Sequence, residues 1–204
     1  MLFDDTYRTI ESPAKGLFKD RGSKFIGYAY PVSTEAEVKE HIALLRREHF
    51  DARHHCYAFR IGPDKQFFRA NDDGEPSGTA GRPILGQLQS QDLTNVLVVV
   101  VRYFGGTLLG VSGLINAYRA AAADALSNAT IVERTVNEVY ELLFPYAAMN
   151  DVMKIMKEEE LEQWDQQFEL DCRLLFSVRK SIADNVTEKL KKTDGVKVVY
   201  VKTV

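Results

Sequence analysis

The stretch from Asn95 to Arg119, NVLVVVVRYFGGTLLGVSGLINAYR, limits most strongly how this chain can fold. Its first part, Val96 to Val101, is a continuous apolar run, and such a run predicts a strand buried on both faces. Glycine residues interrupt the pattern, and Val111 to Ala125 then predicts a helix. A strand, a glycine-rich turn and a helix N-terminus leave unpaired backbone N–H groups, which attract anions. We therefore expect a functional site at this turn.

Length and composition indicate an ordinary globular protein. A chain of 204 residues is long enough for one large domain or two small ones. No apolar stretch reaches the roughly 20 residues of a membrane-spanning helix, and the N-terminus lacks a signal-peptide pattern. Cys56 and Cys172 form no metal-ligand motif. We expect a reduced, cytoplasmic protein with no membrane association, and the net charge of −3 means that any anion-binding surface must be local.

The element pattern predicts an α+β protein with domains at residues 1–132 and 133–204. In the first domain we expect an edge strand and a loop within residues 1–22, a strand over 24–30, a helix capped by Ser33 or Thr34, a hairpin over 56–70 and a short helix after Pro83. In the second we expect strands over 136–144, 161–166, 168–178 and 196–201, with helices near 148–156 and 182–190. This β-α-β-β-α-β order is that of the ferredoxin-like unit.

Arg102 is the charged residue that most needs an explanation, because it ends an otherwise apolar strand. A buried guanidinium without a partner would be costly. Its partner could be a carboxylate of the preceding acidic loop, from Asp72, Asp73 or Glu75, or it could be an exchangeable anionic ligand. The sequence favours neither alternative.

Other chemistries have weaker support. The Asp72–Glu75 cluster lacks the ligand series of a calcium-binding loop, and acidic turns are common for conformational reasons alone. His54 and His55 are adjacent in an expected strand, so their side chains point to opposite faces and cannot both join Cys56 at a metal. No GxSxG motif surrounds a serine. We therefore predict no catalytic residue, no metal site and no cofactor.

Three motifs between about residues 20 and 125 carry a family resemblance. They are Arg53-His54-His55-Cys56, then Asp72-Asp73-Gly74-Glu75-Pro76 with Gly78-Thr79-Ala80-Gly81 and Pro83, then Val101-Arg102-Tyr103-Phe104-Gly105-Gly106 with Leu109-Gly110 and Gly113-Leu114. Together they resemble the Impact family, in its bacterial YigZ- and YvyE-like branch. The resemblance implies an N-terminal domain of the ribosomal protein S5 domain 2-like fold. It also implies a C-terminal ferredoxin-like domain similar to the last domains of elongation factor G.

The resemblance also implies an association with translation, because eukaryotic relatives regulate translation by interfering with the activation of a kinase. Our leading hypothesis is a translation-associated regulator that binds RNA, the ribosome or a protein of the translation machinery. The alternatives are an enzyme acting on a phosphorylated or otherwise anionic small molecule, and a protein-interaction module. The expected anion- or nucleic-acid-binding residues are Arg53, His54, His55, Arg82, Arg102, Tyr103, Gly105, Gly106 and Gly110, with Arg119 as a further phosphate contact; the acidic loop contributes Asp72, Asp73, Glu75 and Thr79.

Overall fold

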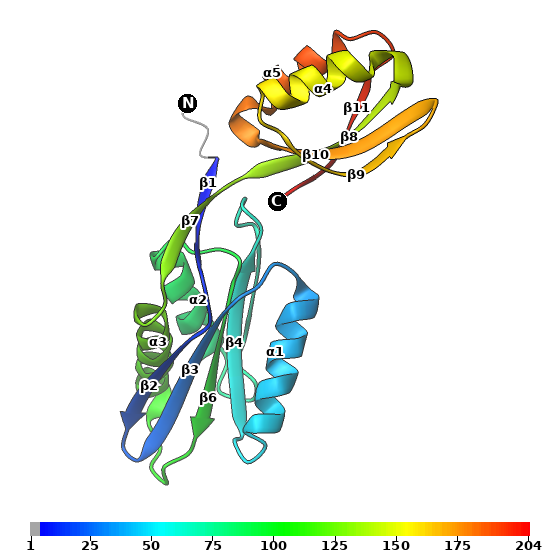
Figure 1. Ribbon diagram of the computed structural model, residues 1–204. Coiled ribbons are helices and arrows are strands. Elements are labelled where there is room, and N and C mark those ends of the chain that lie inside the picture. Colours follow the sequence, from blue (N-terminus) through cyan, green and yellow to red (C-terminus); the bar gives the residue numbers. More distant parts are fainter. Residues whose placement is uncertain (1–4) are drawn as a thin grey trace. The chain divides into compact units, whose positions relative to one another are not determined.

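The computed structural model describes residues 5–204 and shows two units, each with its own core (Figure 1). The N-terminal unit comprises Tyr7–Arg134. The C-terminal unit comprises Thr135–Val204 together with Asp5 and Thr6 from the start of the chain. The α+β class is confirmed. Among the described residues, no helix is long and apolar enough to cross a membrane.

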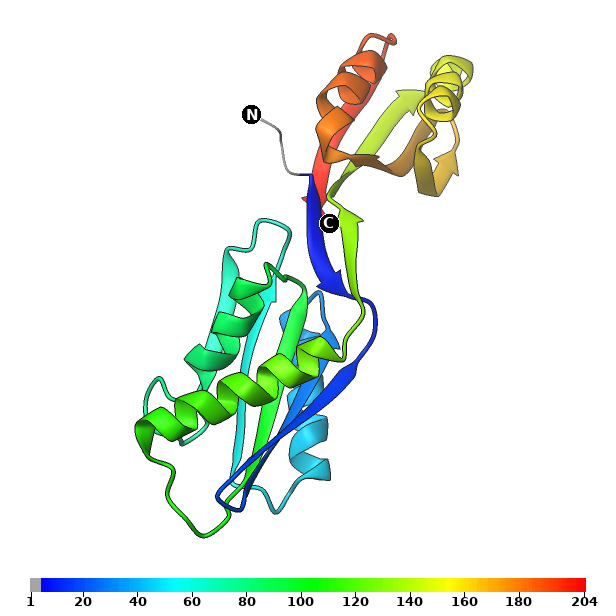
Figure 2. The same ribbon diagram turned by 90° about the vertical axis from the view of Figure 1, so that its left-hand side faces the viewer.

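The N-terminal unit is built on a five-stranded antiparallel sheet with the order β2-β3-β6-β4-β5. Figures 1 and 2 show one helix, α1, on one face of this sheet and two helices, α2 and α3, on the other. The strands are β2 (Ala14–Asp20), β3 (Ser23–Pro31), β4 (His54–Ile61), β5 (Phe67–Asn71) and β6 (Val96–Tyr103), and the helices are α1 (Glu35–Glu48), α2 (Gly81–Ser90) and α3 (Gly110–Ser127). A separate pair, β1 (Thr6–Ile10) and β7 (Ile131–Thr135), forms a two-stranded sheet.

Strand β6 is the centre of this unit, as its composition predicts. Its even-numbered valines, such as Val98 and Val100, pack in the core beneath α2 and α3. Its odd-numbered residues, such as Val99 and Val101, pack beneath α1. Because side chains alternate along a strand, Arg102 continues the even series and faces α2 and α3.

Helix α1 begins as its sequence predicts. Thr34 is the N-cap, and its side chain accepts a hydrogen bond from the Glu37 backbone N–H at 3.3 Å. The Glu37 carboxylate in turn accepts from the backbone N–H of Thr34 at 3.2 Å and of Ser33 at 2.5 Å. This reciprocal capping box satisfies donors that the first helical turn leaves unpaired.

The C-terminal unit has a four-stranded antiparallel sheet with the order β11-β8-β10-β9, the ferredoxin-like arrangement. The predicted β-α-β-β-α-β order is confirmed. Its elements are β8 (Asn137–Pro145), a short 3₁₀ turn η1 (Tyr146–Ala148), α4 (Met149–Glu158), β9 (Glu162–Phe168), β10 (Asp171–Arg179), α5 (Lys180–Lys191) and β11 (Lys197–Thr203).

Two expectations about strands were wrong. The alternation over residues 168–178 spans a hairpin: β9 ends at Phe168, which pairs with Cys172 of β10. Leu170 continues the pattern by chance in the turn, where its side chain is 89% exposed. We expected one strand within the first 22 residues, and the structure has two, β1 and β2. The polar composition concealed the second strand, because edge strands tolerate polar side chains. Residues 1–4 lie outside the described residues.

A bidentate ion pair joins the start of the chain to the C-terminal unit. The Arg179 guanidinium donates to Asp5 through Nε at 2.6 Å and Nη2 at 2.9 Å. The hydrogen bond from Arg179, followed by that from Ser181, lowers the pKa of Asp5 to about 2. Because the folded-state pKa lies below the unfolded one, this stabilisation is complete above the unfolded pKa and is lost as the pH falls through the folded pKa.

We therefore predict that Asp5→Asn lowers the stability of the C-terminal unit at pH 7. The variant should also lose part of the acid destabilisation that the unmodified chain shows between about pH 4 and pH 2. Urea unfolding followed by the fluorescence of Trp164, the single tryptophan, reports on this unit. Identical pH profiles for the two proteins would contradict the prediction.

Candidate functional site

The acidic loop between β5 and α2 is organised by Asp72. Its carboxylate accepts backbone hydrogen bonds from Gly78 at 2.8 Å, Ala80 at 3.1 Å and Gly81 at 2.8 Å. Burial acts to raise the pKa of Asp72, but these three donors outweigh it and the pKa is lowered. Since the N-cap residue Ala80 has no side chain that could cap α2, Asp72 performs the capping from the loop. Thr79 is buried in the same loop, and its hydroxyl donates to the Pro76 carbonyl at 2.6 Å.

Asp73 ties this loop to β4 and α1. One carboxylate oxygen accepts from the backbone N–H of His55 at 2.7 Å, and the other accepts from Arg46 of α1 at 2.9 Å. The Asp73 backbone carbonyl lies 2.9 Å from Nδ1 of His54. That contact requires a proton on Nδ1, because the carbonyl can only accept.

Glu75 is the internal partner of Arg102. Nη1 of Arg102 donates to Oε1 of Glu75 at 2.6 Å, and the Tyr118 hydroxyl of α3 donates to the same oxygen at 2.6 Å. The two charged side chains are only 6% and 4% exposed. The guanidinium also lies over the rings of Phe25 and Phe104, 5.4 and 5.7 Å from their centroids. Of the two partners that the sequence left open, the geometry favours the carboxylate within the chain.

The two histidines are separated by the sheet. Nε2 of His54 lies 4.0 Å from Oε1 of Glu75, so His54 joins the Arg102 cluster on the α2 and α3 side. His55 lies on the α1 side and is buried, and burial is the main cause of its lowered pKa. Both histidines therefore contact the acidic loop, but from opposite faces of the sheet: the His54 ring lies near Glu75, and Nδ1 of His55 lies 3.9 Å from Oδ2 of Asp73.

Tyr103 belongs to a network that the sequence did not reveal. Its hydroxyl lies 2.7 Å from Nδ1 of His49 and donates to Asp51 at 3.0 Å. The other ring nitrogen of His49 contacts the Tyr28 hydroxyl at 2.6 Å. Burial, followed by Asp51, raises the pKa of Tyr103. Helical spacing could have placed His49 on the sheet, because it stands four residues after buried Leu45.

The glycines of the β6–α3 turn have different roles. Gly105 packs against the backbone of the β2–β3 turn, where an added Cβ would lie 1.9 Å from the Gly22 carbonyl carbon. Gly106 and Gly110 have open space around them but adopt φ angles of +89° and +72°, which side chains disfavour. Between them Leu108 is 81% exposed.

Two expected cations come together on another surface. Arg82 of α2 and Arg119 of α3 line a hollow of about 380 Å³, together with Gly78, Pro83, Gly86, Gln87 and Ile115. No acidic residue of the described chain lines it, and neither guanidinium forms a hydrogen bond or ion pair with the described residues. Arg82 does act electrostatically on the Asp72 carboxylate, but that carboxylate already accepts hydrogen bonds from three backbone N–H groups. Arg53 is exposed immediately before β4 and takes no part in this hollow. Within residues 5–204 no group of three acidic, histidine or cysteine side chains could hold a metal ion.

The fold and this site define a two-unit α+β protein, in which an S5 domain 2-like unit carries the buried Arg102 cluster and a ferredoxin-like unit follows. The family model described as the Impact N-terminal domain matches residues 21–126, and the chain belongs to the Impact family. It is 36% identical over 155 residues to the IMPACT family member YvyE of Bacillus subtilis, covering 76% of this chain and 71% of that protein.

Two further comparisons extend over most of the chain. The IMPACT family member YigZ of Escherichia coli strain K12 is 38% identical over 147 residues, 71% of this chain and 72% of that protein. A crystal structure of a hypothetical protein aligns with a TM-score of 0.76 and 27% identity over 97% of this chain and 98% of that one. The likeness in structure therefore includes both units.

The Arg102 cluster predicts a large stability effect. Arg102→Ala leaves the buried Glu75 carboxylate without a cation, and breaking a buried pair in this way costs about 3–5 kcal/mol. The double variant Glu75→Gln and Arg102→Met should lose less stability than Arg102→Ala. The introduced glutamine would still accept a hydrogen bond from Tyr118, and no charge would remain buried. Urea unfolding followed by circular dichroism measures both. An Arg102→Ala protein within about 1 kcal/mol of the parent would show that the pair is not the anchor we describe.

The glycine turn offers a second test of structure. Gly105→Ala should destabilise the N-terminal unit by about 3 kcal/mol or more, because backbone must move to admit the new methyl group. Gly106→Ala is the matched control: it has free space and should cost only the roughly 1–2 kcal/mol of a left-handed residue. Hydrogen exchange of the β6 amides measures both effects. Equal losses for the two variants would argue against close packing at Gly105.

Proposed function

We propose that this Impact-family protein acts in translation by binding RNA, or the ribosome through its RNA, at the α2–α3 hollow. One observation carries the proposal: two arginines from neighbouring helices, Arg82 and Arg119, line one hollow to which the described residues contribute no acidic wall and no hydrogen-bond or ion-pair partner for either guanidinium. Like charges that share a hollow repel each other. A phosphate group accepts hydrogen bonds from two guanidinium groups at once and removes that repulsion.

The location of the hollow supports a polymeric ligand more than an enclosed metabolite. Arg82 and Arg119 are exposed, and Gly86 adds no side chain to fill the space between them. The hollow is thus open to a backbone that passes across it. RNA phosphates are recognised in this way without sequence selection. The family's association with translation supplies the reason to name RNA.

The acidic and histidine groups that an enzyme could use for catalysis are already engaged in hydrogen bonds within the chain. Glu75 is occupied by Arg102 and Tyr118, and Nδ1 of His54 by the loop carbonyl of Asp73. These bonds fix the acidic loop to the sheet and leave the charged atoms inside. For this reason we propose binding as the function of the N-terminal unit.

A protein contact beside the RNA is a second candidate, and it rests on the exposed turn before α3. Phe104, Leu108 and Val111 are 52%, 81% and 60% exposed. Val111, Ile115 and Arg119 follow one another at four-residue spacing, so they share a face of α3. An apolar edge next to a cationic hollow would suit a ribosomal surface, where protein and RNA lie side by side.

The test compares two variants that lose the same charge. Arg82→Gln with Arg119→Gln should weaken binding to single-stranded RNA and lower the slope of log affinity against log salt by about 1 to 2. Lys39→Gln with Arg47→Gln, on the exposed side of α1, should leave the slope within about 0.5 of the parent. Fluorescence anisotropy with labelled RNA gives the slopes, and sedimentation with ribosomes at low and high salt gives the second readout.

Equal losses in the two double variants would mean that only net charge matters and would remove the hollow as the site. Failure of the unmodified chain to bind RNA or to sediment with ribosomes at low salt would overturn the proposed function itself.

A further inference from the structure

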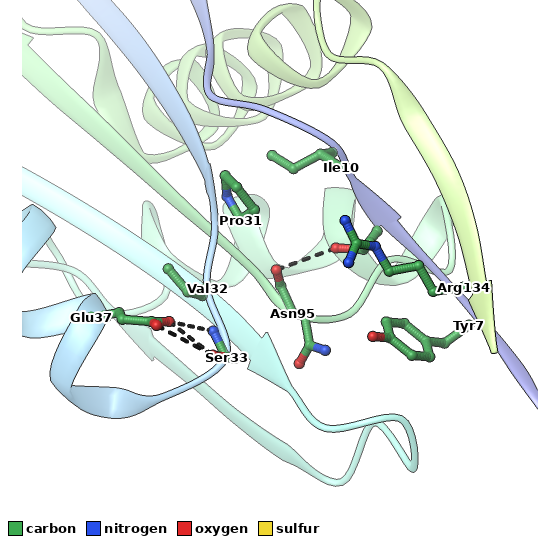
Figure 3. A pocket seen from close by; sticks show the side chains of 9 residues that line it. Tyr7, Ile10, Pro31, Val32, Ser33, Glu37, Asn95 and Arg134 are labelled. Carbon is green, nitrogen blue, oxygen red and sulfur yellow. Dashed lines mark hydrogen bonds between the residues drawn. The ribbon is translucent and has the colours of Figure 1, made fainter. Parts of the chain in front are cut away.

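A different pocket lies at the opposite end of β6, around Asn95 (Figure 3). Its volume is about 210 Å³, and all of its lining residues belong to the N-terminal unit. They come from β1, the end of β3, the start of α1, the residue before β6, and β7. Those that matter for its chemistry are Tyr7, Glu37, Asn95 and Arg134, with Pro31 and Val32 as apolar walls.

Asn95 is held in one orientation. It adopts a φ of +56°, a conformation that asparagine tolerates better than most residues. Its backbone carbonyl accepts from the backbone N–H of Val32 at 3.0 Å and from the hydroxyl of Thr9 at 3.3 Å. Its side-chain oxygen accepts from the backbone N–H of Gly62 at 2.9 Å. Both oxygens are therefore in use, and the side-chain NH₂ group is left as a donor.

Three donors meet at this side of the pocket. Figure 3 shows the Tyr7 hydroxyl and the Arg134 guanidinium pointing toward Asn95. Within the described residues, neither of these groups nor the Asn95 NH₂ has a hydrogen-bond partner. A carboxylate accepts from several donors at once, and a bond to a guanidinium is among the strongest that it forms.

The other side of the pocket carries a fixed negative charge. Figure 3 shows Glu37 beside Ser33, across the pocket from Arg134. Hydrogen bonds from the Ser33 and Thr34 backbone outweigh burial and lower the pKa of Glu37, so this carboxylate is ionised at neutral pH. A doubly charged phosphate near it would be repelled, whereas a cationic group would be attracted.

We propose that this pocket binds a free α-amino acid with a small aliphatic side chain. Its carboxylate accepts from Arg134, Tyr7 and Asn95, its ammonium group lies toward Glu37, and its side chain packs on Pro31 and Val32. The volume of 210 Å³ is below the roughly 300 Å³ at which pockets for larger ligands begin. The site is separate from the α2–α3 hollow and does not depend on RNA binding.

The test uses L-valine and two molecules that each lack one of its charges. Isovalerate lacks the ammonium group, and isobutylamine lacks the carboxylate. Titration of the full-length, ¹⁵N-labelled chain is followed by NMR at the Asn95 side-chain amide. We expect L-valine to bind at least about tenfold more tightly than either analogue, since each lost ion pair is worth about 1.4 kcal/mol or more, which is tenfold in affinity. Inorganic phosphate should not compete.

Substitutions of Arg134 and Glu37 test which side chain binds the carboxylate of the amino acid and which binds its ammonium group. Arg134→Gln should weaken L-valine and isovalerate alike by at least about tenfold. Glu37→Gln preserves the capping box, because glutamine serves in that position as well, and it should reduce L-valine to the affinity of isovalerate. Arg47→Gln, which removes an exposed charge of α1 outside the pocket, is the matched control and should change nothing.

Three results would overturn the proposal. The first is the absence of a saturable shift at Asn95 when L-valine is added. The second is binding of isovalerate or phosphate as tight as that of L-valine. The third is an unchanged affinity for L-valine in Arg134→Gln. The parent spectrum outside the pocket must persist in each variant, which separates lost binding from lost folding.

Discussion

The buried contact of Arg102 with Glu75 connects three elements that would otherwise only lie near one another. Arg102 lies one residue before the end of the central strand β6, Glu75 belongs to the acidic loop, and Tyr118, which donates to the same carboxylate oxygen, belongs to α3. Neither charge can be left alone in this environment without a large penalty. The loop must therefore take its native course whenever the sheet and α3 pack, and the hydrogen bonds of Asp72 and Asp73 fix its two sides.

This arrangement explains why the most conspicuous motif residues are not at the surface where we propose binding. Asp72 holds the first N–H groups of α2, so the loop decides where that helix begins and how its second residue, Arg82, is presented. The ion pair acts on the hollow through the loop and the helix. The charges that contact a ligand in our proposal, Arg82 and Arg119, are ones for which residues 5–204 supply no hydrogen-bond or ion-pair partner.

The sequence predicted what depends on local pattern. A continuous apolar run identified β6, the pair Ser33 and Thr34 identified the start of α1, and the order of elements identified the ferredoxin-like unit. It failed where a pattern continued through a turn, as at Leu170, whose exposure no periodicity reveals. It also could not choose a partner for Arg102, because that choice depends on a loop 27 positions earlier in the chain being folded back onto the strand end.

The two sites that we propose use arginine in opposite settings. Around Arg82 and Arg119 no acid of the described chain lines the hollow, so its wall carries positive charge alone, which suits a polyanion. Around Arg134 the wall includes ionised Glu37, so positive and negative groups face each other across a small space. Net charge, −3 for the chain, indicates neither setting. The two settings differ in the position of their carboxylates. Near the hollow, Asp72 accepts from backbone N–H groups and Glu75 pairs with Arg102. In the pocket, the carboxylate of Glu37, which caps α1, lines the wall.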